Sequence, residues 1–332
     1  MTQTDRSQGV RATIVIPAYN EDQVIGDFLA QIQAAFADLP GCDLEILVVN
    51  DGSTDKTAWN VKEAALRNPR IRMLSFARNL GQQRALVAGL EHARGDVVVT
   101  MDADGQHPPH KAREMIEEWL EDPSRHVVQA VRRGSQGSAA KNWSSALFYW
   151  VMRKLCPEFS IVAGMSDFRL LDRKALALLC RYPDRHRNIR MLVSSLPMQV
   201  HFVEYEVAPR MGGQSKYTFA KMVHLAADGL FAYSNIPLRL SLHLSCMTAA
   251  VSIGFFVYAV AMRCFGETAW GWASIVCLIS GLFSGVFGVL AIIAEYVARI
   301  YEDVRARPLY WVDPSKSYGL DAGNDEDIQR CG

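Results

Sequence analysis

Several features are missing from this 332-residue sequence, and each absence excludes a class of protein. Its seven cysteines form no CxxC pair and no Cys/His cluster with zinc spacing, which argues against a structural metal centre. Neither sign of charge is in excess, because 35 Lys and Arg balance 35 Asp and Glu, so a globally basic nucleic-acid-binding protein is disfavoured. No GxGxxG follows the first expected strand, which disfavours an NAD-binding enzyme.

The N-terminus lacks the apolar segment of a signal peptide. We expect residues 1–11 to be a flexible polar terminus and the soluble part of the chain to stay in the cytoplasm. The odd, scattered cysteines are typical of reduced thiols in that compartment.

Charge is absent from two long stretches, 240–262 and 273–294. At 1.5 Å per residue each spans about 33 Å as a helix, enough to cross a hydrocarbon core of about 30 Å. Their small residues, such as Gly285 and Gly288, suit close helix packing, and the short connector 263–272 predicts a hairpin. Two buried helices of a soluble core are the alternative.

The charges beside these stretches predict an orientation. Basic residues flank both outer ends of the pair: Lys216, Lys221, Arg239, Arg299, Arg305 and Arg307. The positive-inside rule then places the rest of the chain and both termini in the cytoplasm, with the hairpin at 238–298. Residues 217–237 are expected to be an amphipathic interfacial helix, with burial in the protein core as the alternative. Residues 299–332 are expected to be a cytoplasmic tail, disordered after Asp313.

The first hundred residues alternate between strand and helix patterns. Apolar strands are expected at 12–18, 44–50, 71–76 and 96–102, and helices at 23–37, 55–67 and 82–93. This alternation predicts a doubly wound α/β domain, which we place at 12–216. Ligands of such sheets bind beyond the carboxyl ends of the strands, where polar clusters stand in this sequence.

An acidic pair ends the fourth of these strands. Asp102 and Asp104 are separated by one residue, so their side chains point the same way in extended backbone. Oxygen ligands at this spacing suit Mg²⁺ or Mn²⁺, and Gln106 offers a further amide oxygen. The alternative is that the acids merely end a strand at the surface.

Seven segments in order resemble the motifs of family 2 inverting glycosyltransferases of the GT-A fold. They are VIPAYNE (15–21), VVNDGSTD (48–55), ARNLGQQRAL (77–86), MDADGQHPP (101–109), GMSDFRLLDR (164–173), GGQSKYTF (212–219) and RIYEDVRARPLYWV (299–312). With the two apolar stretches, residues 12–312 are similar to polyprenyl-phosphate glycosyltransferases. That group includes dolichol-phosphate mannose synthases, bactoprenol glucosyltransferases and undecaprenyl-phosphate aminoarabinose transferases.

The resemblance implies a role for particular residues. It implies nucleotide binding by Pro17, Tyr19, Glu21, Asp51, Arg78, Gly81, Asp102, Arg210 and Lys216. It implies metal binding by Asp102, Asp104 and Gln106, acceptor-phosphate binding by Arg132 and Arg169, and catalytic roles for Asp104, Asp167 and Arg169. Two departures stand out, Gly105 where the family usually has Leu, and the loop 132–142 beyond Arg132.

Purely structural roles are the alternative for three residues of these motifs. Asp51 would then only cap the following helix, His107 would only occupy a turn, and Arg169 would be a surface residue. Asp172 is expected to be the N-cap of a helix and nothing more.

The resemblance implies an inverting transfer of a sugar from a nucleoside diphosphate, UDP by expectation, to undecaprenyl phosphate. The reaction would take place at the cytoplasmic face of a bacterial inner membrane, with a divalent cation, Mg²⁺ or Mn²⁺, and by analogy in a tetramer. A processive polysaccharide synthase is one alternative, but the QxxRW motif and further spans are missing. A non-catalytic scaffold or lipid carrier is another, and it would not require the acidic pair.

Overall fold

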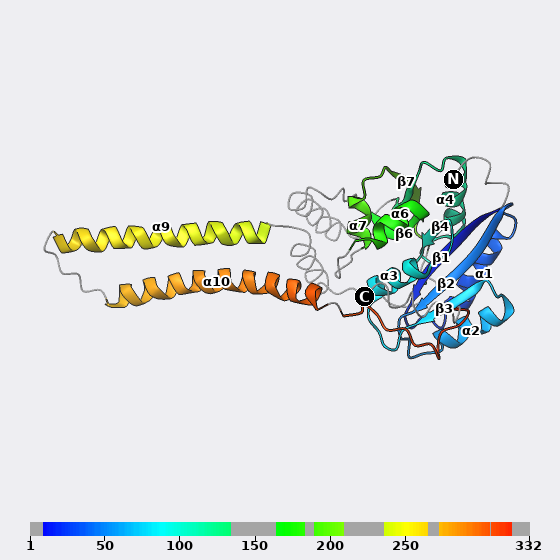
Figure 1. Cartoon of the computed structure of the whole chain (residues 1–332), viewed down its shortest axis with the longest axis horizontal. Helices are drawn as coiled ribbons and strands as arrows, with labels where there is room; N and C mark the ends of the chain where they lie inside the picture. Colours follow the sequence, from blue (N-terminus) through cyan, green and yellow to red (C-terminus); the bar gives the residue numbers. More distant parts are fainter. Residues whose placement is uncertain are drawn as a thin grey trace. The chain divides into compact units, whose positions relative to one another are not determined.

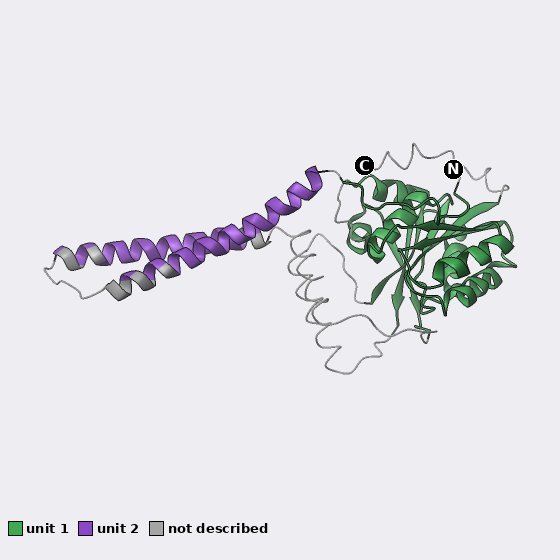
Figure 2. Cartoon of the chain, turned by 90° about the horizontal axis from the view of Figure 1, so that it is seen from below, with its two compact units in different colours: residues 1–153, 157–216, 307–332 green, residues 154–156, 217–306 purple. Residues whose placement is uncertain are grey.

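The computed structural model describes residues 9–133, 164–182, 189–208, 236–264, 272–305 and 307–320. The chain divides into two compact units (Figure 2). The first comprises residues 1–153, 157–216 and 307–332, and the second comprises 154–156 and 217–306. Most of the expected flexible N-terminus, most of the expected interfacial helix, Arg210 and Lys216 lie outside the described residues.

The first unit is built on a seven-stranded sheet in the order β3-β2-β1-β4-β6-β5-β7 (Figure 1). Its strands are β1 (Val10–Ala18), β2 (Cys42–Asn50), β3 (Ile71–Ser75), β4 (Val97–Thr100), β5 (Val127–Arg132), β6 (Met165–Asp172) and β7 (Val200–Tyr205). β1 pairs in parallel with both β2 and β4, and β2 pairs in parallel with β3. The expected α/β domain of the GT-A type is therefore confirmed.

Helices cover both faces of this sheet because its central strands are apolar on both sides. They are α1 (Ile25–Phe36), α2 (Thr57–Arg67), α3 (Gln82–His92), α4 (Pro109–Glu121), α6 (Arg173–Cys180) and α7 (Ile189–Ser195). Ile14 and Ile16 of β1 share a core cluster with Phe28 of α1. Val15 faces α3, where a Cβ on Gly89 would lie only 2.2 Å from its Cγ1. The closeness of α3 to the sheet fixes where its first residues stand.

β6 is a feature that the sequence did not predict as a strand. It pairs antiparallel with both β4 and β5, so the sheet is mixed rather than parallel throughout. All its residues are buried, and three of them, Asp167, Arg169 and Asp172, are charged. Buried charges at alternate positions hide the apolar pattern by which a central strand is recognised. Asp172 caps α6 as expected, accepting a hydrogen bond from the Ala175 amide at 2.8 Å.

The segment after the second apolar stretch corrects another expectation. Residues 307–320 belong to the first unit and pair with its edge strand, so the predicted disorder after Asp313 is wrong for residues 314–320. Met73 and Tyr318 exchange two backbone hydrogen bonds, and Asp313 donates to the Ser75 carbonyl at 2.8 Å. An edge strand exposes unpaired backbone groups, and this segment covers them.

The second unit contains two long helices, α9 (Ile236–Cys264) and α10 (Trp272–Val304). Their windows Leu240–Tyr258 and Gly281–Val304 are long and apolar enough to cross a membrane, with 6% and 0% of each buried. Core helices of a soluble protein would be mostly buried, so these windows favour the membrane over that alternative. A Cβ on Gly285 would lie 2.6 Å from Thr248 Cγ2, which shows how closely the pair packs there. The second window extends ten residues beyond the predicted end at 294.

Candidate active site

The carboxyl ends of β1 and β2 are joined through short polar side chains. Asn20 stands at φ 54° just after β1, and its side chain accepts a hydrogen bond from the Thr54 amide at 2.9 Å. Its own amide donates to Ser53 Oγ, while Thr57 Oγ1 receives the Glu21 amide at 2.8 Å. Pro17 lies within β1, and Tyr19 and Glu21 follow it half-buried. The predicted nucleotide residues of the first motif therefore lie in the last part of β1 and in the hydrogen-bonded turn that follows it.

Asp51 holds the loop before α3 rather than capping α2. Its carboxylate accepts hydrogen bonds from the amides of Leu80 at 2.7 Å and Gly81 at 2.9 Å, and from Asn79 Nδ2 at 3.0 Å. Burial raises its pKa, and these hydrogen bonds partly oppose that rise. The helix-cap alternative is wrong, because α2 begins at Thr57 and Asp55 accepts the Thr57 amide.

Gly52 allows this loop to approach the turn after β2. Its φ is +65°, and a Cβ there would lie 2.3 Å from the carbonyl carbon of Arg78. Replacing Gly52 with Ala is therefore expected to destabilise the protein by about 2 kcal/mol or more and to displace the 78–81 loop. Thermal unfolding of the full chain in detergent measures this change.

Gly26 provides the matched control for that variant. It lies in α1 with no heavy atom within 4 Å of the added Cβ, so Gly26→Ala is expected to be neutral or stabilising by about 0.5–1 kcal/mol. Equal effects of the two substitutions would contradict the assigned close approach.

Asp102 follows β4 and is held by two neighbours. Gln82, the first residue of α3, donates its side-chain amide to Asp102 Oδ1 at 2.6 Å. The backbone amide of Asp102 donates to His107 Nδ1 at 2.9 Å, so the other ring nitrogen of His107 carries the proton when the ring is neutral. Burial and the nearby carboxylates of Asp167 and Asp104 raise the pKa of Asp102 to about 7.

His107 is fully buried beneath this carboxylate. Burial and the charge of Arg132 lower its pKa to about 3, so the ring is neutral at physiological pH. It stacks on Phe168 with ring centroids 4.7 Å apart. Its Nε2 lies 3.7 Å from Asp102 Oδ2 and has no hydrogen-bond partner among the residues that the structure describes. His107 thus does more than occupy a turn, because it fixes the backbone of Asp102.

Asp104 closes the turn that carries the predicted cation ligands. Its Oδ1 accepts the Gln106 amide at 3.0 Å, and Gly105 between them has φ 76°. A glycine adopts this left-handed conformation without strain. No group of three or more His, Cys, Asp or Glu residues that would by itself hold a metal occurs within the described ranges.

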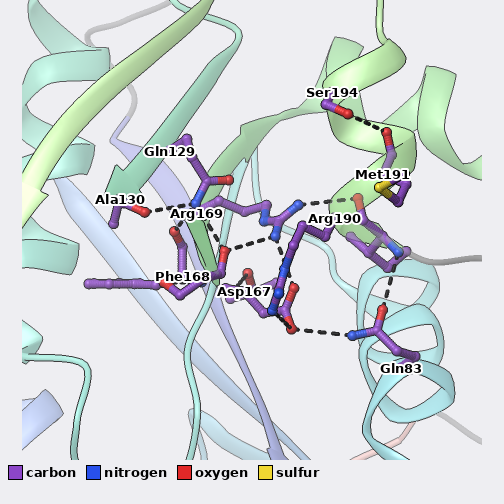
Figure 3. Close-up of polar contacts among 12 residues, drawn as sticks. Gln83, Gln129, Ala130, Asp167, Phe168, Arg169, Arg190, Met191 and Ser194 are labelled. Atoms are coloured by element: carbon purple, nitrogen blue, oxygen red, sulfur yellow. Dashed lines mark hydrogen bonds and ion pairs between the residues drawn. The ribbon is translucent and has the colours of Figure 1, made fainter. Parts of the chain in front are cut away.

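Asp167 of β6 lies between the guanidinium groups of Arg169, on the same strand, and Arg190, on α7 (Figure 3). Its Oδ1 accepts Arg169 at 2.9 Å, and its Oδ2 accepts Arg190 at 3.1 Å and Gln83 Nε2 at 3.2 Å. Burial opposes ionisation of this carboxyl group, but Arg190 and Arg169 outweigh it and lower the pKa. Asp167 is therefore an ionised acceptor at neutral pH.

Arg169 is wholly buried, which excludes the surface-residue alternative. Besides Asp167, its guanidinium donates to the carbonyls of Ser166 at 2.9 Å and Ile189 at 3.2 Å. Burial lowers its pKa to about 10, so the group stays protonated. Arg132, by contrast, is exposed and donates from Nε to the Tyr205 hydroxyl at 3.2 Å. Only Arg132 of this predicted phosphate-binding pair presents an accessible cation.

The sheet register brings the acidic groups together. Val97 of β4 lies opposite Asp172 of β6, and Thr100 lies opposite Arg169. Asp102 follows shortly after β4 and lies close enough to Asp167 of β6 for that carboxylate to raise its pKa. Gln82 and Gln83, adjacent at the start of α3, bond one of these carboxylates each. Gln82 and Gln83 lie within the motif ARNLGQQRAL (77–86), but the motif alone assigned no site role to them. No motif or spacing in the sequence pointed to Arg190.

Comparison with known proteins identifies the family of this chain. The family model described as Glycosyl transferase family 2 matches residues 13–179. This chain belongs to that family. The resemblance of its motifs to glycosyltransferases with a polyprenyl-phosphate acceptor is thereby confirmed.

Curated relatives of this family member match along nearly its whole length. The uncharacterized glycosyltransferase YkcC of Bacillus subtilis is 35% identical over 95% of this chain and 96% of its own length. The bactoprenol glucosyl transferase of Shigella phage SfV is 31% identical over 92% of this chain and 99% of its own. Glucosyl-3-phosphoglycerate synthase of Mycobacterium tuberculosis, crystallised with Mn²⁺ and UDP, aligns with a TM-score of 0.47 and 19% identity over 69% of this chain and 80% of its own.

Proposed function

We propose that this glycosyltransferase moves a sugar from a nucleoside diphosphate, UDP in the first instance, to the phosphate of undecaprenol at the cytoplasmic face of a membrane. The observation that carries the proposal is the proximity of Asp102, just after β4, to Asp167 of the neighbouring strand β6, in a chain that also has two membrane-length helices. Relatives named as bactoprenol glucosyl transferases support the lipid acceptor.

The oxygen ligands at this site fit a divalent cation. Asp102 and Asp104 are oxygen ligands of the hard type. The pKa of Asp102 is raised by burial and by the carboxylates of Asp167 and Asp104, whose negative charge a cation would balance. The diphosphate of a donor supplies further oxygens, so two protein carboxylates suffice. When bound, the cation would neutralise charge on the departing nucleoside diphosphate. We propose Asp102, Asp104 and Gln106 as its ligands, with Mg²⁺ and Mn²⁺ both suited to them.

Around the donor, the chain itself supplies shape and orientation. We propose that Asp51 fixes the loop carrying Arg78 and Gly81, and that this loop and the turn at 17–21 enclose the nucleotide. Arg210 and Lys216 stay predictions for the diphosphate. Gln82 holds the Asp102 carboxylate from the side of α3, so the nucleotide loop and the cation ligands are positioned by one helix.

The acceptor requires no strong base. A phosphate monoester has a second pKa of about 6 and is largely dianionic at neutral pH. It therefore attacks the anomeric carbon without giving up a proton, opposite the leaving diphosphate, and the configuration inverts. Asp167 is a weak base because two arginines lower its pKa, so we assign it to orienting the sugar and the arginines. Arg132 contacts the acceptor phosphate, and Arg169 acts through Asp167.

The deciding experiment supplies purified full-length protein in detergent with undecaprenyl phosphate, Mn²⁺ or Mg²⁺ and a panel of nucleotide sugars beginning with UDP-glucose. We expect one sugar per lipid phosphate, and no transfer when EDTA removes the cation. Growth of a polymer would indicate a processive synthase. A folded protein that shows no cation-dependent nucleotide binding by calorimetry would instead be a scaffold or lipid carrier.

A further inference from the structure

The segment 307–320, called the strap below, does more than cover the edge of the sheet. It lies along β3 and then along residues 75–77, where the Trp311 carbonyl accepts the Ala77 amide at 3.3 Å and Ser317 Oγ accepts the Ser75 amide at 3.0 Å. At its far end, the Gly319 carbonyl accepts Arg72 Nε at 3.0 Å. The strap thus begins beside Phe76 and Ala77, which lead into the 78–81 loop.

Tyr310 of the strap contacts both flanks of that loop. On the strand side its ring stacks on buried Phe76, with centroids 5.3 Å apart and planes 18° apart. On the helix side its hydroxyl donates to Glu91 of α3 at 2.8 Å, and its ring meets His92 edge-on at 6.1 Å. One side chain therefore ties the strand before the loop to the helix after it.

The parts that Tyr310 ties together are those that form the candidate donor site. The loop between them gives its amides to Asp51, and the first residue of α3 holds Asp102. If α3 rotated or slid relative to β3, the loop amides that bind Asp51 and the Gln82 side chain that binds Asp102 would move together. We propose that Tyr310 is a positioning residue for donor binding, acting through α3 and the 78–81 loop. This inference rests on the proposed function.

The test is UDP binding by the full chain in detergent with Mn²⁺, measured by calorimetry, together with donor and acceptor KM. Tyr310→Ala is expected to weaken UDP binding about tenfold and to raise donor KM equally, while acceptor KM stays unchanged. Tyr310→Phe keeps the ring contact and loses only the hydrogen bond, so it is expected to retain most of the affinity. A merely structural role would lower the melting temperature without separating the two KM values.

Trp311→Ala is the matched control, because its side chain is 63% exposed and its link to Ala77 runs through the backbone. It is expected to bind UDP like the wild type. Equal affinity of wild type and Tyr310→Ala, or an equal loss in Trp311→Ala, overturns the inference. If Tyr310→Ala does not fold, Glu91→Ala replaces it with an expected loss of about threefold, and an unchanged affinity overturns the inference. Failure of the wild type to bind UDP would instead refute the proposed function.

Discussion

Replacing Asp104 with Ala is expected to reduce sugar transfer at least ~100-fold while leaving the fold intact. Asp104 lies in a turn after β4, half-exposed, and its neighbours Ala103 and Gly105 are the buried residues of that turn. The variant removes a proposed cation ligand without opening a cavity in the core. Labelled donor and undecaprenyl phosphate in detergent measure transfer, and circular dichroism checks the fold.

Glu63→Gln is the control for general effects of removing an acid. Glu63 forms an exposed ion pair with Arg67 on α2, at 3.9 Å, which contributes little to stability. Cation affinity is read separately, from Mn²⁺ binding in the presence of UDP. Near-normal transfer by folded Asp104→Ala would remove the metal hypothesis.

Replacing Asp167 with Ala is expected to lower both stability and activity. The substitution leaves the guanidinium of Arg169 fully buried without its carboxylate, and breaking a buried pair in this way costs about 3–5 kcal/mol. Arg190 is 39% exposed at its side chain and can turn towards water, so its loss of the same partner costs less. Thermal unfolding of the full chain measures the loss of stability. Sugar transfer at a temperature where the variant stays folded measures the loss of activity.

A double variant separates the two roles of Asp167. Asp167→Leu combined with Arg169→Met removes both buried charges, so stability is expected to recover in large part while transfer does not. Recovery of both would show that Asp167 only maintains the fold.

The same ion pair predicts how stability depends on pH. Because the folded-state pKa of Asp167 lies below its ordinary value of 3.8, its contribution is fully present above that value. The contribution is lost as the pH falls from there through the lower folded-state pKa. Acid titration of wild type and the double variant should therefore diverge only below about pH 4.

Much of the fold was readable from local patterns. The apolar runs in β1, β2 and β4 could only be central strands, because they leave no polar face. The acidic pair after β4 was readable for the same reason, since a strand's end fixes the direction of its last side chains. Uncharged helices of membrane length are also a composition signal that needs no tertiary context.

Other features depended on contacts between distant residues. β6 was missed because its charged residues are neutralised by Arg190, which lies more than twenty positions away along the chain, and by each other. The strap was taken for a tail because its polar residues satisfy an edge strand that lies over two hundred residues earlier.

The sequence by itself determined the family, the strands and helices of the first hundred residues, the membrane-length helices and the acidic pair, because each depends on residues that are neighbours in the chain. Only the tertiary structure decided that Asp167 lies near Asp102, that Arg169 is buried rather than accessible, and that Tyr310 joins Phe76, just after β3, to α3. Burial, and the pKa values it sets, arises from residues that meet only after the chain has folded.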